Sequence, residues 1–187
     1  IIILTIFFLG IFFRIYNLNY EDLWHDEILS FWIADPSISF IETLNRHNEL
    51  EQVPILFNLI LKYFYKIFGY NIYLGRYLSC FFGIISMIFC YLLYLQFKNC
   101  SGSIFFITLI SFNIFLIKYS QELRVYSLMT LLIILSLYFL FKIFNKKQDK
   151  SNYFLFILFL FLAILSHPFS IIVLISAICL SLIRIIF

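Results

Sequence analysis

Residues 125–144 read VYSLMTLLIILSLYFLFKIF, and Lys142 is the single charged side chain among them. A helix of about 20 such apolar residues is long enough to cross the hydrocarbon core of a bilayer. Further apolar stretches lie before and after it, at residues 1–13, 77–97, 104–119 and 153–166, and a last one begins near Phe169. The sequence therefore predicts an all-α, polytopic bundle of transmembrane helices.

The composition of the whole chain also indicates an integral membrane protein. Of its 187 residues, 64% are hydrophobic, 22% are aromatic and only 12% are charged. The mean hydropathy of +1.02 is far above that of soluble domains, in which about half of the residues are apolar. The net charge of +3 is small, so nucleic acid is not an expected partner.

The two ends of the sequence indicate how much of a domain is present. The chain begins at Ile1 rather than at a methionine, and it stops inside an apolar stretch. We therefore expect residues 1–187 to be the N-terminal part of a longer transmembrane domain, truncated at both ends.

The first connection between apolar stretches is long and polar. It covers residues 17–53. A connection of this length is more often a loop that carries a functional site than a simple turn. It is followed at residues 54–68 by PILFNLILKYFYKIF, in which Asn58, Lys62 and Lys66 recur at every fourth position. That spacing places them in one polar stripe on an otherwise apolar helix. The pattern favours a helix lying in the membrane interface, with a fully buried span as the alternative.

Charged residues indicate the side of the membrane that each connection faces. Lysine-rich connections stay in the cytoplasm, and six basic residues fall on the side of the densest lysine cluster: Lys98, Lys142, Lys146, Lys147, Lys150 and Arg184. The other seven basic residues lie opposite, so their count alone does not decide, but nine of the ten acids, all except Asp149, also lie opposite. We therefore expect loop 17–53, turn 121–124 and His167 to meet on the outer face.

Trp24-His25-Asp26-Glu27 places two adjacent carboxylates in this outer loop. On a helix, neighbouring side chains point about 100° apart, so Asp26 and Glu27 are expected to play different roles. Low-dielectric surroundings favour the neutral form of a carboxyl group, which suits a general base that works near neutral pH. The alternative is that Asp26 only caps the short helix that follows it.

Three arginines lie near the predicted outer boundary. Arg124 has two readings, an ion pair with a loop carboxylate or a contact with a phosphate group, which the planar guanidinium suits. Arg14 and Arg76 are each expected either to anchor a helix at the interface or to contact a ligand.

A divalent metal ion is a further hypothesis. His25, His47 and His167 are predicted on one side of the membrane, where Glu27, Glu49 or Glu51 could complete a metal site. No HxxxH or DxD spacing supports such a site. Glu51 and His25 remain the metal candidates.

The order of these motifs resembles a known family. An apolar helix that ends in Arg14 and is followed by Leu23-Trp24-His25-Asp26-Glu27 resembles the first outer loop of the GT-C glycosyltransferases. The nearest branch is the protein O-mannosyltransferase-like and aminoarabinose-transferase-like one. Gln52-Val53-Pro54 departs from it, since many members have two prolines there. The resemblance continues in order through Pro54-Ile55-Leu56-Phe57, Phe68-Gly69, Gly75-Arg76-Tyr77-Leu78-Ser79, Gln121-Glu122-Leu123-Arg124-Val125-Tyr126-Ser127 and Ser166-His167-Pro168-Phe169.

This resemblance implies an enzyme that moves a sugar from a polyprenyl-phosphate carrier to an acceptor hydroxyl, with inversion, at the outer face of the cell membrane. Asp26 would be the base, with Glu27 as a second catalytic residue. Arg124, with Arg76 or Arg14, would offset the charge of the leaving phosphate. Glu51 resembles a metal-binding position of some members. Further substrate contacts are expected from Gln121, Glu122, Tyr126 and His167.

The acceptor could be a glycan, a lipid or a protein, and the sequence does not distinguish them. The alternative function is a lipid or sugar transporter or flippase that uses the acidic loop as a proton or substrate site. A transporter would be expected to carry ionisable residues near the middle of its spans, and here the charged groups gather at one surface.

Overall fold

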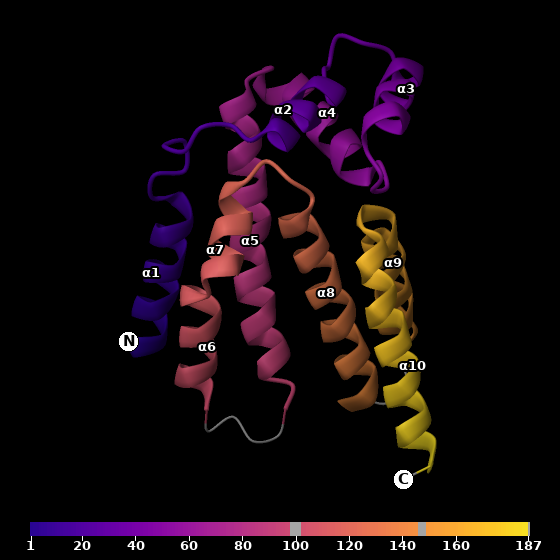
Figure 1. Cartoon of the computed structure of the whole chain (residues 1–187). Helices are drawn as coiled ribbons and strands as arrows, with labels where there is room; N and C mark the ends of the chain where they lie inside the picture. Colours follow the sequence, from indigo (N-terminus) through magenta and orange to yellow (C-terminus); the bar gives the residue numbers. More distant parts are fainter. Residues whose placement is uncertain (98–101, 146–148, 187) are drawn as a thin grey trace.

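The computed structural model describes residues 1–97, 102–145 and 149–186, with side chains as far as residue 180, and every regular element in these ranges is helical (Figure 1). The all-α prediction is therefore confirmed. The elements are α1 (Ile2–Ile15), α2 (His25–Ile33), α3 (Phe40–Leu50), α4 (Leu56–Phe68), α5 (Ile72–Tyr94), α6 (Ser103–Phe112), α7 (Ile114–Gln121), α8 (Tyr126–Asn145), α9 (Lys150–Ser166), the 3₁₀ turn η1 (Pro168–Ser170) and α10 (Ile171–Ile186).

Two of the described helices, α5 and α8, are long and apolar enough to cross a membrane. The bent pair α6–α7 is a third candidate span if it is counted as one segment. Three shorter apolar helices lie at Ile2–Ile15, Lys150–Ser166 and Pro168–Leu180. All six apolar stretches of the sequence are thus helical, but fewer pass the length criterion than the sequence indicated.

The span predicted at residues 104–119 is divided into α6 and α7, and the chain bends by 44° between these two helices. Asn113 has an extended backbone at this point, and its side-chain oxygen accepts a hydrogen bond of 3.0 Å from the Leu116 N–H. Asparagine competes with helical hydrogen bonds in this way, so it ends one helix and caps the next.

The helices of the bundle pack side by side. α8 packs against α5 on one side and α9 on the other, while α1 packs against α6 (Figure 1). Small residues allow the closest approaches. A Cβ atom on Gly83 of α5 would lie 2.5 Å from the Ser120 Cβ, so only glycine lets α7 come this close.

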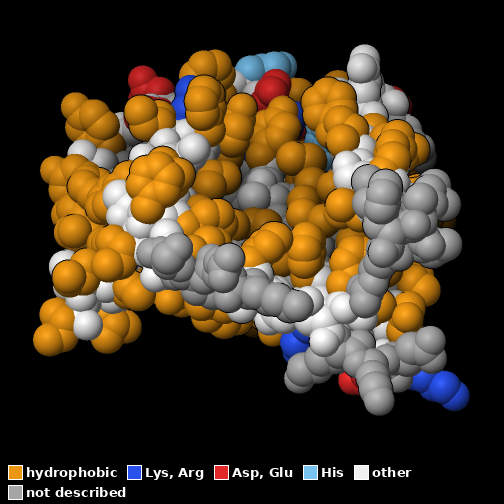
Figure 2. All heavy atoms as spheres, turned by 90° about the horizontal axis from the view of Figure 1, so that it is seen from below, with side chains coloured by type: hydrophobic (Ala, Val, Ile, Leu, Met, Phe, Trp, Pro, Cys, Tyr) orange, Lys and Arg blue, Asp and Glu red, His pale blue; other side chains and the backbone are white. Residues whose placement is uncertain are grey.

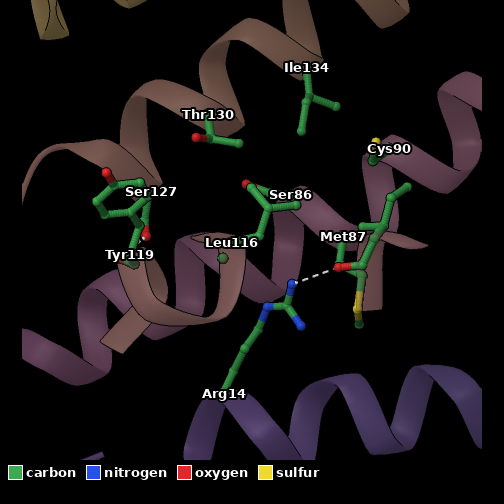
Figure 3. Close-up of a pocket in the computed structure, with 11 residues that line it drawn as sticks. Arg14, Ser86, Met87, Cys90, Leu116, Tyr119, Ser127, Thr130 and Ile134 are labelled. Atoms are coloured by element: carbon green, nitrogen blue, oxygen red, sulfur yellow. Dashed lines mark hydrogen bonds between the residues drawn. The ribbon is translucent and has the colours of Figure 1, made fainter. Parts of the chain in front are cut away.

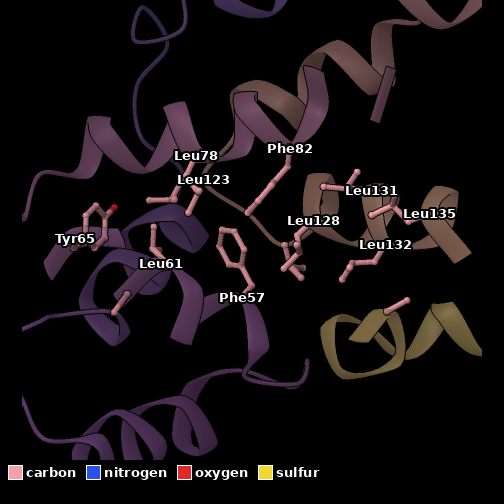
Figure 4. Packing of buried hydrophobic residues seen from close by; sticks show 13 residues of the cluster. Phe57, Leu61, Tyr65, Leu78, Phe82, Leu123, Leu128, Leu131, Leu132 and Leu135 are labelled. Atoms are coloured by element: carbon pink, nitrogen blue, oxygen red, sulfur yellow. The ribbon is translucent and has the colours of Figure 1, made fainter. Parts of the chain in front are cut away.

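The helices of the long polar loop and α4 gather at one end of the bundle, where Figure 1 shows α2 and α4 near the upper end of α5 and, together with α3, beyond the end of α8. Phe57 and Leu61 of α4 pack with Phe82 of α5 and Leu128 of α8 in the main hydrophobic core (Figure 4). The same core therefore fixes α4 and the end of α2 to the bundle.

The polar stripe of α4 is largely buried. Lys62 donates hydrogen bonds to the carbonyls of Asp35 (3.0 Å) and Ile38 (2.7 Å) and to the Thr43 hydroxyl (2.7 Å). Lys66, one turn later, is exposed. The stripe thus stabilises the α2–α3 connection. The place of this helix in the membrane interface stays a prediction.

The outside of the bundle is strongly apolar. Large hydrophobic side chains are exposed on several helices, among them Phe8, Phe105, Phe115 and Phe154. Seen from the end opposite α2–α4, hydrophobic side chains cover most of the described surface (Figure 2). This surface suits a lipid environment. Lys98, Lys146 and Lys147, used above for orientation, lie outside the described residues, as does the side chain of Arg184.

Candidate functional site

Glu27 is the third residue of α2, is fully buried and forms a two-pronged ion pair with Arg76 of α5. Its Oε1 accepts from Arg76 Nε at 2.9 Å, and its Oε2 accepts from Nη2 at 2.6 Å. The same carboxylate accepts from the backbone N–H groups of Leu123 (2.7 Å) and Trp24 (3.1 Å). One side chain therefore joins the start of α2, α5 and the α7–α8 connection.

The charge of Glu27 is maintained by these donors. Burial alone would raise the pKa of its carboxyl group, but the hydrogen bonds from Arg76, Leu123 and Trp24 outweigh burial and lower the pKa below its ordinary value. Arg76 also donates to the carbonyls of residues 18, 21 and 22. It is neither an interface anchor nor a free ligand contact, the two roles expected from its position.

Asp26 differs from its neighbour because its side chain is 62% exposed. The helix begins at His25, with Trp24 as its N-cap residue, and the Trp24 N–H is satisfied by Glu27. Capping is therefore a role of Glu27, and the capping alternative for Asp26 is wrong. The Asp26 carboxylate lies 3.5 Å from Arg124 Nη2 and is otherwise open to solvent.

Arg124 lies between α7 and α8 and forms the ion pair that was one of its two predicted roles. Its Nη1 lies 2.7 Å from Glu51 Oε1 and also donates to the Ser30 hydroxyl at 3.3 Å. Burial opposes the charge of the guanidinium, but the carboxylates of Glu51 and Asp26 outweigh it and raise the pKa of Arg124. A permanently charged guanidinium therefore borders the Asp26 carboxylate.

Two open clefts flank Trp24 on this end of the molecule. The Asp26 cleft has a volume of about 260 Å³ and the Asn17 cleft one of about 280 Å³. Trp24, Lys118 and Glu122 line both clefts and form the wall between them. The Asp26 cleft is further lined by Asp26, Glu27, Phe115, Tyr119, Arg124 and Tyr126, and the Asn17 cleft by Asn17, Leu18, Glu21, Arg76, Ile114, Ile117 and Gln121.

Two predicted substrate contacts of the second outer loop have defined partners. The Gln121 side chain donates to the carbonyls of Phe13 (2.9 Å) and Tyr16 (3.0 Å), so it satisfies the last carbonyls of α1. Burial raises the pKa of Glu122, and Lys118, whose Nζ is 3.8 Å from Glu122 Oε1, offsets only part of this effect.

Tyr126 lines the Asp26 cleft, and His167 lies next to it. Their ring centroids are 5.9 Å apart, and Tyr126 also packs against Tyr119 at 4.8 Å. His167 Nδ1 accepts from the Phe169 N–H at 3.2 Å. Burial and the nearby charge of Arg124 lower the pKa of His167, so its ring is neutral at pH 7. The three predicted outer-face segments therefore do meet.

Arg14 does not reach this site. It is buried inside the bundle, where it donates to the carbonyls of Gly10 (2.8 Å), Ile110 (3.2 Å) and Ser111 (3.1 Å). Figure 3 shows its side chain among the residues that line a small cavity of about 20 Å³. Because Ile110 and Ser111 end α6, Arg14 satisfies carbonyls that the helix break leaves without helical partners. The interface and ligand roles predicted for it do not fit this position.

The candidate metal ligands do not gather. Within the described part of the chain, no three His, Cys, Asp or Glu side chains lie close enough to hold a metal ion. His47 Nε2 donates to the Val53 carbonyl at 2.8 Å, and its Nδ1 contacts Asn58 at 3.1 Å. Glu51 is paired with Arg124, and His25 is exposed at the start of α2. The described residues therefore do not fit a metal site.

Lys118 of α7 lines both clefts and was not predicted from the sequence. Its spacing of four residues from Glu122 on one helix was the available signal, since side chains at that spacing are neighbours.

The family of the chain follows from a comparison with known proteins. A family model described as dolichyl-phosphate-mannose-protein mannosyltransferase matches residues 52–185. The chain belongs to this family. It is a membrane glycosyltransferase, as its resemblance to the protein O-mannosyltransferases implied. No curated protein and no solved structure matches the chain.

The family match has a bearing on the site. The matched range contains Arg76, Arg124, Tyr126 and His167, and it begins after the Asp26 loop. This family uses polyprenyl-phosphate sugars, so the match favours the transferase over the transporter alternative.

Proposed function

We propose that this protein transfers a sugar from a polyprenyl-phosphate donor to an acceptor hydroxyl in the Asp26 cleft. The family description names dolichyl-phosphate mannose as the donor and a protein as the acceptor, so a mannosyl group and a serine or threonine hydroxyl are the first substrates to test. The observation that carries the proposal is the exposed carboxylate of Asp26, which lies in a cleft bordered by an arginine.

In the proposed reaction, Asp26 accepts the proton of the acceptor hydroxyl. The hydroxyl oxygen attacks the anomeric carbon from the side opposite the phosphate, and the bond from that carbon to the phosphate oxygen breaks. The polyprenyl phosphate leaves with the electron pair of that bond. Because the attack comes from the opposite side, the configuration at the anomeric carbon is inverted. Glu27 cannot serve as the base, because it is buried and its oxygens already accept four hydrogen bonds.

Arg124 supports this mechanism through its place in the cleft. Its Nη2 lies 3.5 Å from the Asp26 carboxylate. Because the guanidinium lines the same cleft, it stabilises the negative charge that develops on the leaving phosphate.

The location of the cleft supports a lipid-linked donor. The cleft lies at the end of an apolar bundle and is lined in part by Phe115 of α7, whose side chain is exposed. A polyprenyl chain can stay in the bilayer while its sugar phosphate enters the cleft from the side. We place this end of the bundle on the outer face of the cell membrane.

The test is the substitution Asp26→Asn in the full-length protein. Removal of a general base lowers turnover by about 10²–10⁴-fold, while donor binding and the yield of folded protein stay near the wild-type values. Asp22→Asn is the matched control, because Asp22 is also exposed in this loop and contacts Arg76 only through its backbone carbonyl. Wild-type turnover in Asp26→Asn would exclude Asp26 as the base.

A further inference from the structure

Three cationic side chains line the two clefts, and they differ in how many donors they have free. Arg76 is 2% exposed and uses its guanidinium in five hydrogen bonds to Glu27 and to backbone carbonyls. A guanidinium has five N–H donors, so Arg76 has none left for a ligand.

Arg124 is also largely committed. Its terminal nitrogens contact Asp26, Ser30 and Glu51, and its side chain is 12% exposed. Its Nε–H has no partner among the described residues, but that nitrogen is buried away from the cleft surface. Within the described residues its hydrogen bonds come from Nη1, so Arg124 offers a ligand its charge and the Nη2 N–H groups, and a more exposed donor would add to these.

Lys118 of α7 is that donor. Its side chain is 51% exposed, and the only carboxylate paired with it in the described part of the chain, that of Glu122, is 3.8 Å away. This distance is too long for a hydrogen bond. The ammonium also lies 5.2 Å from the centre of the Trp24 ring. Both contacts are weak, so they hold Lys118 at the cleft without occupying its donors.

The position of Lys118 follows from the helix break at Asn113. α7 is turned by 44° relative to α6, and it carries Lys118 onto the wall that separates the two clefts. As part of this wall, Lys118 lines the cleft that also contains Asp26 and Arg124.

We infer that Lys118 binds the phosphate oxygens of the lipid-linked donor in the Asp26 cleft; this assignment rests on the proposed transferase function. A lysine ammonium binds phosphate as a compact charge with three donors. As the bond to the anomeric carbon breaks, the phosphate gains negative charge, and a hydrogen-bonded cation stabilises it more than it stabilises the bound donor. Lys118 thus complements the fixed charge of Arg124.

The test uses the full-length protein in membranes, with Lys118→Met, Lys118→Gln and Lys118→Arg. Initial rates of sugar transfer are measured at varied concentrations of polyprenyl-phosphate mannose. Loss of one charged hydrogen-bond donor to phosphate raises the donor KM about tenfold in Lys118→Met and Lys118→Gln. Lys118→Arg retains most of the wild-type affinity, and the acceptor KM is unchanged in all three.

Lys66→Met is the matched control, because Lys66 is an exposed lysine of α4 that does not line either cleft. It keeps the wild-type donor KM. A second readout is product inhibition by polyprenyl phosphate, which weakens by the same factor in Lys118→Met. Inorganic phosphate does not inhibit the wild type at these concentrations. If it did inhibit, and the inhibition were lost in Lys118→Met, the ligand would be free phosphate and the lipid-linked assignment would be overturned.

The two proposals fail in different ways. If the wild-type protein transfers no sugar from polyprenyl-phosphate donors, the proposed function fails. If the wild type is active but the folded Lys118→Met and Lys118→Gln variants keep its donor KM and its inhibition by polyprenyl phosphate, only the assignment of Lys118 is overturned.

Discussion

Asp26 and Glu27 are adjacent residues with opposite environments. Glu27 faces inward and is enclosed by Arg76 and two backbone N–H groups, whereas Asp26 faces a cleft. Their different directions on the first turn of α2 account for this division. One carboxylate is therefore suited to hold the structure and the other to meet a substrate.

Glu27→Gln is expected to lower the stability of the folded protein at neutral pH. The substitution leaves Arg76 buried without its counter-charge, and breaking a buried ion pair costs about 3–5 kcal/mol. The pH dependence has a definite sign. Since the folded pKa of Glu27 lies below its unfolded value of about 4.3, its stabilising effect is complete above that pH and is lost as the pH falls through the folded pKa.

Thermal unfolding in detergent, followed between neutral pH and about pH 3, measures both effects. The gap between wild type and Glu27→Gln should be widest at neutral pH and close in acid. Glu49→Gln, which alters an exposed acid of α3, serves as the control. A gap that does not change with pH would contradict the ionised, ion-paired state of Glu27.

At the scale of the elements, α4 connects the outer loop to the bundle through two faces. Its apolar face, with Phe57 and Leu61, packs into the core (Figure 4). Lys62 on its other face gathers two carbonyls and a hydroxyl from the α2–α3 connection and α3. The lysine thus replaces hydrogen bonds that this irregular segment cannot form within itself.

Lys62→Met is expected to loosen the segment between α2 and α3. It removes the donor from one buried and two partly buried acceptors, and a buried acceptor left unsatisfied costs about 1–3 kcal/mol. Limited proteolysis should therefore cleave near residues 35–39 faster than in the wild type. Lys66→Met on the same helix should leave the cleavage rate unchanged, and equal rates in all three proteins would show that Lys62 is not needed there.

The elements and the site differ in how far the sequence predicts them. Apolar length alone predicted the bundle helices, because a bilayer-spanning helix needs little beyond composition. The break at Asn113 was missed, since one asparagine in an apolar run is a weak signal until its side chain is seen to cap α7. The meeting of Asp26 with Arg124 was predicted from the side of the membrane that each faces.

The partners of buried charges could not be predicted in the same way. Arg76 and Glu27 are 49 residues apart, and Lys62 lies 27 residues from the carbonyl of Asp35. Such pairs depend on how helices distant in sequence pack, and no local pattern reports it. The position of Arg14 at the broken end of α6 depends in turn on a break that the sequence did not predict.

For the whole molecule, the two clefts lie at one end of the bundle, the end at which α2, α3 and α4 gather (Figure 1). That end is formed by α2, α3, α4 and the α7–α8 connection. The contacts of Arg124 with Asp26 and Glu51 join the α7–α8 connection to α2 and to the end of α3. This arrangement suits an enzyme that takes one substrate from the membrane and another from outside it.

The proposed orientation predicts which residues are reached from outside the cell. A cysteine introduced by Asp22→Cys, at the site end, should react with a membrane-impermeant maleimide in intact cells. A cysteine introduced by Lys150→Cys, at the start of α9, should react only after permeabilisation. Both positions are exposed, so reactivity reports sidedness. Labelling of the unmodified protein gives the background, and the reverse pattern would place the site in the cytoplasm.

The carboxylate of Glu27 holds the residues on both sides of the proposed chemistry. It follows Asp26 directly in the chain, and it binds the N–H of Leu123, which directly precedes Arg124. The hydrogen bond between Glu27 and Leu123 therefore sets the distance between the Asp26 carboxylate and the Arg124 guanidinium. Both Glu27 and Leu123 are buried, so this bond involves no exposed residue of the loop. Substitutions of exposed loop residues can change which acceptor is recognised without moving Asp26 relative to Arg124. The same fold can therefore evolve to act on different acceptors.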